Sequence, residues 1–352
     1  MATIYDVAKA AGVSPKTVSR VMNGDAPVNV RTRELVEATM TSLGYVPSSA
    51  ARAMRSQRTG LVGLVTGAIS GPQAAGGATG LPDLQIVQGI QRTLAESGMT
   101  LLISDTSEPG RVPQLVRTLR EHRVEGLFYV AGHHQRIELP DGARAARMVL
   151  VNGFDDAGTP CVLPDDTEGQ WALTAALIAR GHRRIGFLTL PAALVAQGLR
   201  LEGYARALAE AGIAYDPALV VETNPSGAPQ EREVLQAAID GMLALKVPPT
   251  VLCCGNDRLA VAVYGILRAR GVKVPEGMSV AGYDDYRVIS ETLYPQLTTM
   301  ELPYGRMGEA AARLMLGELR GDEPVAIGAR VLVEGELRWR ESVTPGPAAG
   351  AQ

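Results

Sequence analysis

Aromatic residues and cysteines are scarce in this sequence. Phe, Trp and Tyr make up 4% of its 352 residues, and only three residues are Phe. The cysteines, Cys161, Cys253 and Cys254, are odd in number and lack metal-ligand spacing. These features argue against a disulfide framework and a cysteine-based metal site, so we expect buried, reduced thiols. No apolar run approaches the roughly 20 residues that a membrane-spanning helix needs.

An export signal is lacking as well. Asp6 and Lys9 interrupt any apolar stretch close to the N-terminus. Hydrophobic residues make up 46% and charged residues 20% of the chain, which is typical of a soluble globular protein. The chain is long enough for two or three domains, each with its own core. We therefore expect a cytoplasmic protein with no membrane partner.

The motifs of common enzyme classes are also missing. The sequence has no phosphate-binding loop and no G-x-S-x-G elbow, and its Gly-rich segment lacks the order that dinucleotides require. His133, His134 and Glu138 could be drawn as a metal trio, but they follow a predicted strand in a polar stretch. We expect that stretch to be a solvated loop. The prediction is a protein that is not an enzyme and that uses no cofactor and no metal.

Basic residues are concentrated at the N-terminus of this acidic chain. Residues 1–60 contain eight Lys or Arg and four Asp or Glu, which gives a net charge of +4. The remaining 292 residues contain 26 basic and 33 acidic residues, which gives −7. A small cationic head on an anionic body indicates that the head binds a polyanion and the body does not.

Three short helices are predicted in the head. Thr3 can cap the first in a Thr-x-x-Asp box, Ser14 can cap the second, and Asn29 can cap the third, which runs from about Arg31 to Leu43. The first two are joined by a Gly-Val-Ser turn, an arrangement that fits the helix-turn-helix, whose second helix enters the DNA major groove. A small capped bundle with a solvated basic face is the alternative.

The body shows a different pattern from residue 61 onward, because short apolar strands alternate with amphipathic helices. Strands are predicted at 61–66, 100–104, 126–130, 148–151, 184–190, 219–222, 250–254 and 279–283. Helices are predicted near 84–97, 111–122, 167–181, 199–212, 231–245, 257–271 and 303–320. The alternation implies βαβ units and an α/β fold with two doubly wound lobes of parallel sheet. A ligand is expected in the cleft at the carboxyl ends of the strands.

The run IYDVAKAAGVSPKTVSRVMNGDAPVNVRTRELVEATMTSLGYVP carries a resemblance. It resembles the DNA-binding headpiece of the lactose-repressor (LacI/GalR) family of bacterial transcription regulators. The resemblance implies that the start of the second helix reads bases, through Pro15, Lys16 and Arg20. Arg20 can address guanine O6 and N7, and Lys16 can donate to guanine or to phosphate. Phosphate contacts, which fix register, are expected from Thr3, Tyr5, Ser14, Thr17, Ser19, Asn23 and Arg33.

The segment SSAARAMRSQRTG, residues 48–60, is similar to the hinge helix of that family. Alone, so short a helix is expected to be unfolded. The resemblance implies that it orders beside its dimer mate on DNA and that Ala51 and Met54 enter the minor groove, where an apolar wedge kinks the duplex. Methionine stands where leucine is usual. An ordinary Ala/Arg linker is the alternative.

The body resembles a periplasmic sugar-binding-protein fold used as an effector sensor. The similar stretches are IARGHRRIGFL, RLEGYARAL, CGNDRLAVAVYGILRARGVKVPEGMSVAGYDD and PQLTTMELPYGRMGEAAARLM. The resemblance assigns effector binding to Asn152, Arg200, Asn256, Asp284 and Tyr304. A guanidinium, amides and a carboxylate suit a polyol, and an aromatic ring packs on the apolar face of a sugar. The Gly/Ala-rich loop 67–82 departs from the family because it lacks an aromatic residue, and it is either an adapted lid or an insertion.

The predicted protein is a homodimeric transcriptional regulator, a repressor of a carbohydrate-utilisation operon. Its partners are a near-palindromic double-stranded DNA operator and a small sugar-like effector. The alternatives are a transport-type solute-binding protein, and a repressor that responds to a non-sugar metabolite or a phosphoprotein. The predicted domains are a helix-turn-helix domain (1–46), a hinge helix and linker (47–60), an effector-binding and dimerisation domain (61–342) and a disordered tail (343–352). The two lobes are expected at about 61–160 with 303–320, and about 161–299 with 321–342.

Overall fold

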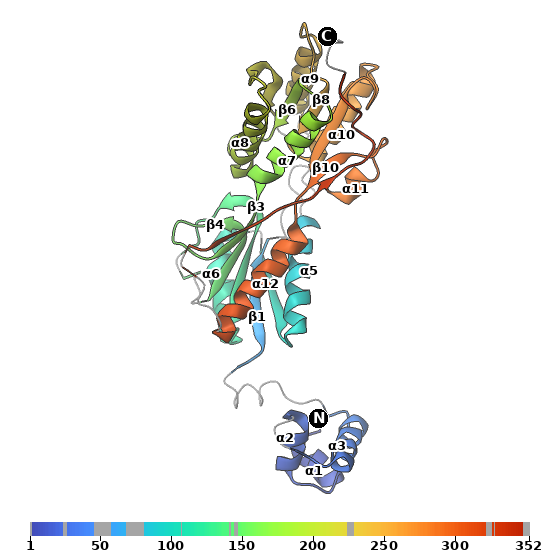
Figure 1. Ribbon diagram of the computed structural model, residues 1–352. Helices are drawn as coiled ribbons and strands as arrows, with labels where there is room; N and C mark the ends of the chain where they lie inside the picture. Colours follow the sequence, from blue (N-terminus) through green and yellow to red (C-terminus); the bar gives the residue numbers. More distant parts are fainter. Residues whose placement is uncertain are drawn as a thin grey trace. The chain divides into compact units, whose positions relative to one another are not determined.

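The chain divides into two units, residues 1–60 and residues 61–352. The computed structural model describes residues 2–23, 27–45, 58–67, 81–106, 108–140, 142–143, 147–223, 229–321, 326 and 328–347 (Figure 1). The predicted hinge positions Ala51 and Met54, and most of the loop 67–82, lie outside the described residues. No helix in the described part is long and apolar enough to cross a membrane.

The described part of the first unit folds into three helices. Its helices are α1 (Ile4–Ala10), α2 (Pro15–Asn23) and α3 (Val30–Ser42). They enclose a small core of apolar side chains that are 9% exposed or less: Val7, Ala8, Ala11, Val18, Val21 and Val36. Gly12 turns the chain between α1 and α2 at φ +63°, a conformation that favours glycine.

The predicted caps of these helices are confirmed. The Thr3 hydroxyl accepts a hydrogen bond from the amide of Asp6, and the Asp6 carboxylate accepts one from the amide of Thr3 at 2.8 Å, which completes the capping box. The Ser14 hydroxyl accepts from the amide of Thr17 at 3.1 Å, and Asn29 accepts from the amide of Arg31 at 3.0 Å. Each helix therefore begins where a side chain replaces a missing backbone acceptor.

The second unit contains two six-stranded sheets. The first has the order β11-β5-β4-β3-β1-β2, and the second has the order β12-β10-β9-β8-β6-β7. The first sheet comprises β1 (Leu61–Thr66), β2 (Thr100–Asp105), β3 (Leu127–Arg136), β4 (Met148–Phe154), β5 (Cys161–Pro164) and β11 (Arg330–Val333). The second comprises β6 (Ile185–Thr189), β7 (Val220–Glu222), β8 (Val251–Cys254), β9 (Ser279–Asp284), β10 (Thr298–Glu301) and β12 (Leu337–Arg338).

All neighbouring strands in these sheets run parallel except β10 and β12. The α-helices of this unit are α5 (Leu81–Glu96), α6 (Val112–Glu121), α7 (Asp166–Ala179), α8 (Val195–Glu210), α9 (Pro229–Leu243), α10 (Asp257–Ala269), α11 (Arg287–Ser290) and α12 (Tyr304–Arg320). The expected doubly wound α/β fold with two lobes is confirmed.

The expected lobe boundaries were wrong at two places. We expected residues 161–299 and 321–342 in the second lobe, but β5 and β11 belong to the first sheet. β5 pairs with β4, and β11 extends the sheet by pairing with β5. The chain therefore crosses between the lobes three times: after β5, after β10, and between β11 and β12 (Figure 1).

The end of the chain also differs from the expectation. Residues 343–347 were expected in a disordered tail, but Val343 is 6% exposed and the amide of Gly346 donates to the carbonyl of Arg180 at 2.9 Å. His182 reaches the carbonyl of Thr344 through Nε2 at 2.9 Å. This segment is thus part of the second lobe, while residues 348–352 lie outside the described part.

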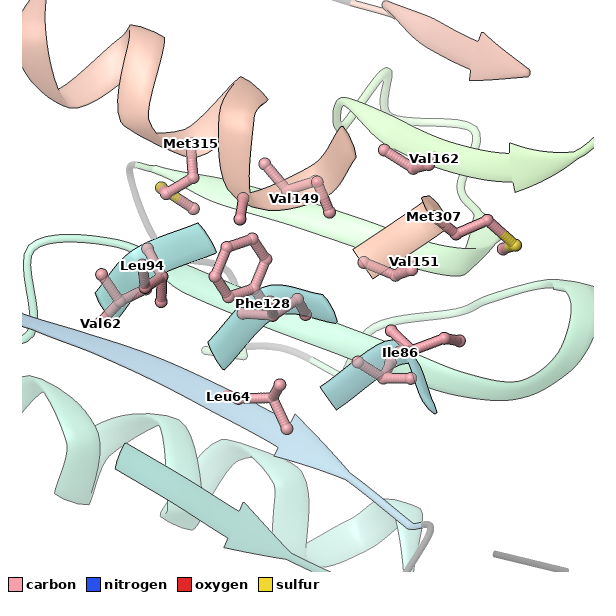
Figure 2. Close-up of a cluster of buried hydrophobic side chains, with 14 of the residues drawn as sticks. Val62, Leu64, Ile86, Leu94, Phe128, Val149, Val151, Val162, Met307 and Met315 are labelled. Carbon is pink, nitrogen blue, oxygen red and sulfur yellow. The ribbon is translucent and has the colours of Figure 1, made fainter. Parts of the chain in front are cut away.

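Helices α5 and α12 cover one face of the first sheet, and their side chains meet those of β1, β3, β4 and β5 in an apolar core (Figure 2). Two glycines allow the helices to approach closely. A Cβ atom at Gly89 would lie 2.2 Å from the backbone oxygen of Gly305, and one at Gly308 would lie 2.2 Å from that of Ile86. Helix α12 begins at Tyr304, so the close packing of α5 on α12 also fixes the position of Tyr304.

We predict that Gly308→Ala destabilises the second unit, because the new methyl group meets helix backbone and cannot be accommodated by a side-chain rotation. The cost should be about 1–3 kcal/mol, as for other overpacked sites. Gly317→Ala is the matched control in the same helix, since a Cβ there meets no atom within 4 Å. It should stabilise by about 0.5–1 kcal/mol. Urea unfolding followed by circular dichroism at equal protein concentration measures both, and equal effects would refute the close approach.

Candidate DNA-binding surface and effector site

The predicted base-reading side chains lie at the surface of α2. Val18 is fully buried and Val21 is 9% exposed, so these residues turn one side of the helix toward the core. Lys16 and Arg20 are exposed, and Pro15 at the first helical position is partly buried. Both cations are therefore available to a polyanion, and both come from the helix that is expected in the major groove.

The predicted phosphate contacts are mostly accessible. Tyr5 is 72% exposed, Thr3, Ser14 and Arg33 are exposed, and Thr17 and Ser19 are partly buried. The side chain of Asn23 lies outside the described residues. The Thr3 hydroxyl donates to the Asp6 carboxylate at 2.7 Å. Since a hydroxyl has a single proton to donate, Thr3 would have to break this bond before it could donate to a phosphate.

All five predicted effector residues line one cavity in the second unit. The cavity measures about 230 Å³ and lies at the carboxyl ends of strands from both sheets. The predicted residues on its wall are Asn152, Arg200, Asn256, Asp284 and Tyr304. They come from β4, α8, the start of α10, the end of β9 and the start of α12. Side chains that are far apart in the sequence thus converge where a doubly wound sheet is expected to bind ligands.

Arg200 is the most strongly held of these side chains. It is 4% exposed, its Nε donates to Asp166 at 2.7 Å, and its Nη1 donates to the carbonyl of Gly255 at 2.5 Å. Its guanidinium carbon lies 3.6 Å from the centre of the Tyr283 ring, a cation–π contact. Burial works against the charge, but Asp166, Tyr283 and Asp284 together outweigh it, so the pKa of Arg200 lies above its ordinary value.

Asp166 is a site residue that the sequence reasoning missed. It is the first residue of α7, its side chain is fully buried, and it accepts from Arg200 and bonds to Nδ1 of His134, each at 2.7 Å. Burial opposes its ionisation, but Arg200 and His134 together hold its pKa below the ordinary value. The available signal was the Asp165-Asp166 pair, which directly follows the unrecognised strand β5.

His133 and His134 were placed wrongly in a solvated loop. Strand β3 continues to Arg136, although its pairing with β4 is interrupted between Val130 and Gln135. Both imidazoles line the cavity, and His134 is 7% exposed. Glu138 is exposed, and no group of three or more metal-ligating side chains occurs among the described residues.

The two asparagines are held by backbone contacts. The Asn152 Nδ2 donates to the carbonyl of Ala131 at 3.2 Å. Asn256 caps α10 by accepting from the amide of Leu259 at 2.8 Å through Oδ1. Because the cap occupies Oδ1, the Nδ2 group of Asn256 remains the donor that a ligand could use. Asn256 thus serves both as a helix cap and as part of the cavity wall.

Asp284 lies at the end of β9 in an uncommon conformation. Its φ is +119°, that of Asp285 is +46°, and that of Asn152 is +60°, so three non-glycine residues near the cavity adopt positive φ. Such conformations cost free energy and are concentrated at functional sites. Burial raises the pKa of Asp284 to about 7, although Arg200 opposes the shift from 3.9 Å away.

Asp257 lies behind this site and is not exposed at all. Its carboxylate accepts from the hydroxyl of Thr299 at 2.6 Å and from the amide of Tyr286 at 2.8 Å. Burial and the nearby Asp284 raise its pKa well above the ordinary value. Asp257 therefore supports the turn that follows β9.

Comparisons with known proteins find relatives for both units of the chain. Models of two families match the chain: bacterial regulatory proteins of the lacI family over residues 3–48, and a periplasmic binding protein-like domain over residues 174–343. The chain is 31% identical over 335 residues to the sucrose operon repressor of Escherichia coli, across 95% of this chain and 99% of that protein.

Two solved structures are similar over 97% of this chain. One is a complex of the transcriptional regulator CelR with cellobiose, with 29% identity, all of that chain covered and a TM-score of 0.63. The other is the lac repressor dimer bound to operator and the anti-inducer ONPF, with 26% identity, 98% of that chain covered and a TM-score of 0.74.

The raised pKa of Asp284 predicts a pH-dependent stability. Between the ordinary aspartate value of about 3.9 and about 7, the folded chain binds a proton that the unfolded chain has lost. The stability contributed by this group is therefore present at low pH and is lost as the pH rises to 7. Asp284→Asn removes the titration, so the variant should gain stability relative to the parent from pH 4.5 to 7 and stay level above pH 8.

Urea unfolding at several pH values measures this difference. Asp240→Asn is the control, because Asp240 bonds to Arg270 and its pKa lies below the ordinary value. The stability that Asp240 contributes is lost only as the pH falls below the ordinary aspartate pKa. The difference in stability between Asp240→Asn and the parent should therefore stay constant between pH 5 and 8. A constant difference for Asp284→Asn as well would contradict the assignment.

Proposed function

Because the chain belongs to the lacI family of bacterial regulatory proteins, we propose that it is a sequence-specific DNA-binding repressor controlled by a small sugar-like effector. One observation carries this proposal: Asn152, Arg200, Asn256, Asp284 and Tyr304 come from five separate segments and converge on one cavity between two lobes. Such a cavity binds a ligand that bridges the lobes, and the three-helix unit supplies a cationic surface for DNA.

The proposed mechanism couples the two sites through the angle between the lobes. A ligand that contacts both lobes binds one arrangement better than the other, and it shifts the population by that difference in affinity. Because β1 belongs to the first lobe, a change in the angle between the lobes also moves the segment that precedes β1. In a homodimer this would change the separation of two DNA-binding domains and hence the affinity for a near-palindromic operator.

The remaining parts of the proposal follow from the family. The sucrose operon repressor supports control of a carbohydrate-utilisation operon, and the CelR–cellobiose complex supports a sugar-like effector. The proposed protein is cytoplasmic and is not an enzyme. Its proposed domains are the DNA-binding domain (1–46), the hinge and linker (47–60), with minor-groove contacts by Ala51 and Met54, and the sensor from residue 61. The site residues named above carry the proposed contacts.

We predict that Arg20→Ala loses sequence preference. An arginine that reads guanine contributes about 1–3 kcal/mol of discrimination, so affinity for the operator should fall by roughly 10- to 100-fold and affinity for random DNA by much less. Arg33→Ala is the control, because a lost phosphate contact should weaken both complexes equally and lower the salt dependence by about one ion. Fluorescence anisotropy with the upstream DNA and a scrambled duplex measures both. Equal losses in Arg20→Ala would rule out base reading.

We also predict that Asp284→Ala abolishes the effector response and leaves operator binding intact. The carboxylate lies on the cavity wall, whereas the DNA-binding unit folds around its own core. A screen of sugars for release of the chain from its own upstream DNA identifies the effector, and a dose–response curve then compares the variants. Asp240→Ala, an exposed site on α9, should respond like the parent. A normal curve for Asp284→Ala would remove this residue from the site.

A further inference from the structure

Three buried polar side chains form a continuous chain through the cavity wall. His134 lies on β3 in the first lobe, Asp166 begins the first helix of the second lobe, and Arg200 lies on α8. Their side chains are 6%, 0% and 5% exposed, and each of the two links measures 2.7 Å. Both oxygens of one carboxylate are therefore occupied, one by each lobe.

Several neighbouring groups hold the side chain of Arg200 in one position. Nε is bonded to Asp166, Nη1 is bonded to the carbonyl of Gly255, and one face of the guanidinium lies on the ring of Tyr283. The Tyr283 hydroxyl in turn donates to the backbone carbonyl of Asp166 at 3.4 Å. These contacts use two of the five N–H groups of Arg200 and fix the plane of the guanidinium, so the remaining N–H groups on Nη1 and Nη2 point in fixed directions.

The charges around the cavity do not favour an anion. Among the described residues that line it, Arg200 is the only guanidinium, no lysine is present, and the carboxylates are Asp166 and Asp284. The full positive charge of Arg200 is compensated by Asp166 in direct contact. An anionic ligand beside Arg200 would therefore meet an ion pair with no net charge and would gain little Coulombic attraction from it.

We propose that Asp166, oriented by His134, is a positioning residue that fixes Arg200 and neutralises its charge, so that the cavity selects an uncharged, hydroxyl-rich effector over a phosphorylated or carboxylated one. This inference rests on the proposed function, because it assumes that the effector binds in this cavity. Neutral hydroxyls can use the fixed donor of Arg200, the amides of Asn152 and Asn256, and the acceptor oxygens of Asp284 without requiring a free cation.

Inorganic phosphate tests the charge compensation without knowledge of the effector. The melting temperature of the full-length protein is measured against phosphate concentration, with sodium chloride at matched ionic strength. The parent should show no saturable increase. Asp166→Asn keeps the shape of the side chain but removes its charge, so Arg200 should then bind phosphate and raise the melting temperature by about 2–4 °C at saturation.

A double variant separates this effect from phosphate bound elsewhere. Asp166→Asn with Arg200→Met keeps every other basic residue of the chain, so it should lose the saturable increase. The proposal is overturned if the parent already shows an increase that Arg200→Met abolishes, or if Asp166→Asn shows none. If the Asp166 variants do not fold, the parent and Arg200→Met still test the proposal, because a saturable increase in the parent that Arg200→Met abolishes would overturn it.

The role of His134 is tested with sugars that differ only in charge. Once a neutral effector is found, the parent should bind it at least 100-fold more tightly than its phosphate ester or uronate. His134→Leu removes the donor to Asp166 and should reduce this ratio at least 10-fold. His134→Asn places an amide nitrogen near the position of Nδ1 and should restore it, which a purely structural role of the imidazole would not predict.

These results distinguish the inference from the proposed function. If the effector proves to be a phosphorylated or carboxylated sugar, the inference fails while the function of a DNA-binding repressor stands. If no sugar changes DNA binding, the proposed effector fails, and the phosphate titration still decides whether Asp166 neutralises Arg200. A ratio that is unchanged in His134→Leu would remove His134 from the positioning role.

Discussion

The buried ion pair between Asp166 and Arg200 is the contact on which the sensor site depends. It joins the beginning of α7 to the middle of α8, and it lies directly after the point where the chain first passes from one lobe to the other. Removing one partner of a buried pair costs about 3–5 kcal/mol, because the other charge stays in a medium that cannot solvate it. A buried pair therefore needs further partners for both of its groups. His134 bonds to Asp166, the Gly255 carbonyl accepts from Arg200, and the Tyr283 ring stacks on the guanidinium.

Close backbone contacts bring these groups together. A Cβ atom at Gly203 would lie 2.2 Å from the carbonyl oxygen of Thr167, so α7 and α8 approach each other more closely than any other residue at this position would allow. A Cβ at Gly169 would lie 2.3 Å from the hydroxyl of Tyr283. In the first lobe, Gly89 and Gly308 bring α5 and α12 together in the same way. These glycines therefore let the helices that support the cavity pack backbone against backbone, because no side chain separates them.

Most of the fold could be predicted from sequence because its elements are long and regular. Amphipathic helices of thirteen or more residues were placed within about four residues of their observed ends, and α10 and α12 within about two. The strands that were missed, β5, β10, β11 and β12, have four residues or fewer. A strand of that length carries few alternations from which its period can be read, and β11 and β12 lie at sheet edges, where pairing with a distant segment decides their conformation.

Some of the site residues could be predicted from the sequence, and others could not. Arg200, Asn256 and Asp284 lie in long stretches similar to a known family, so their convergence could be expected before the fold was known. Asp166 and His134 could not be found in this way, because their significance arises only from a contact across 32 residues of sequence. Asp166 follows an unrecognised strand, and His134 continues a strand past an irregularity in its pairing. The charge that a ligand meets in this cavity is therefore set by residues that no local pattern identifies, and similarity to sugar-binding relatives leaves that charge undetermined. That charge depends on which groups are buried, which groups touch Arg200, and how many carboxylates face its single guanidinium.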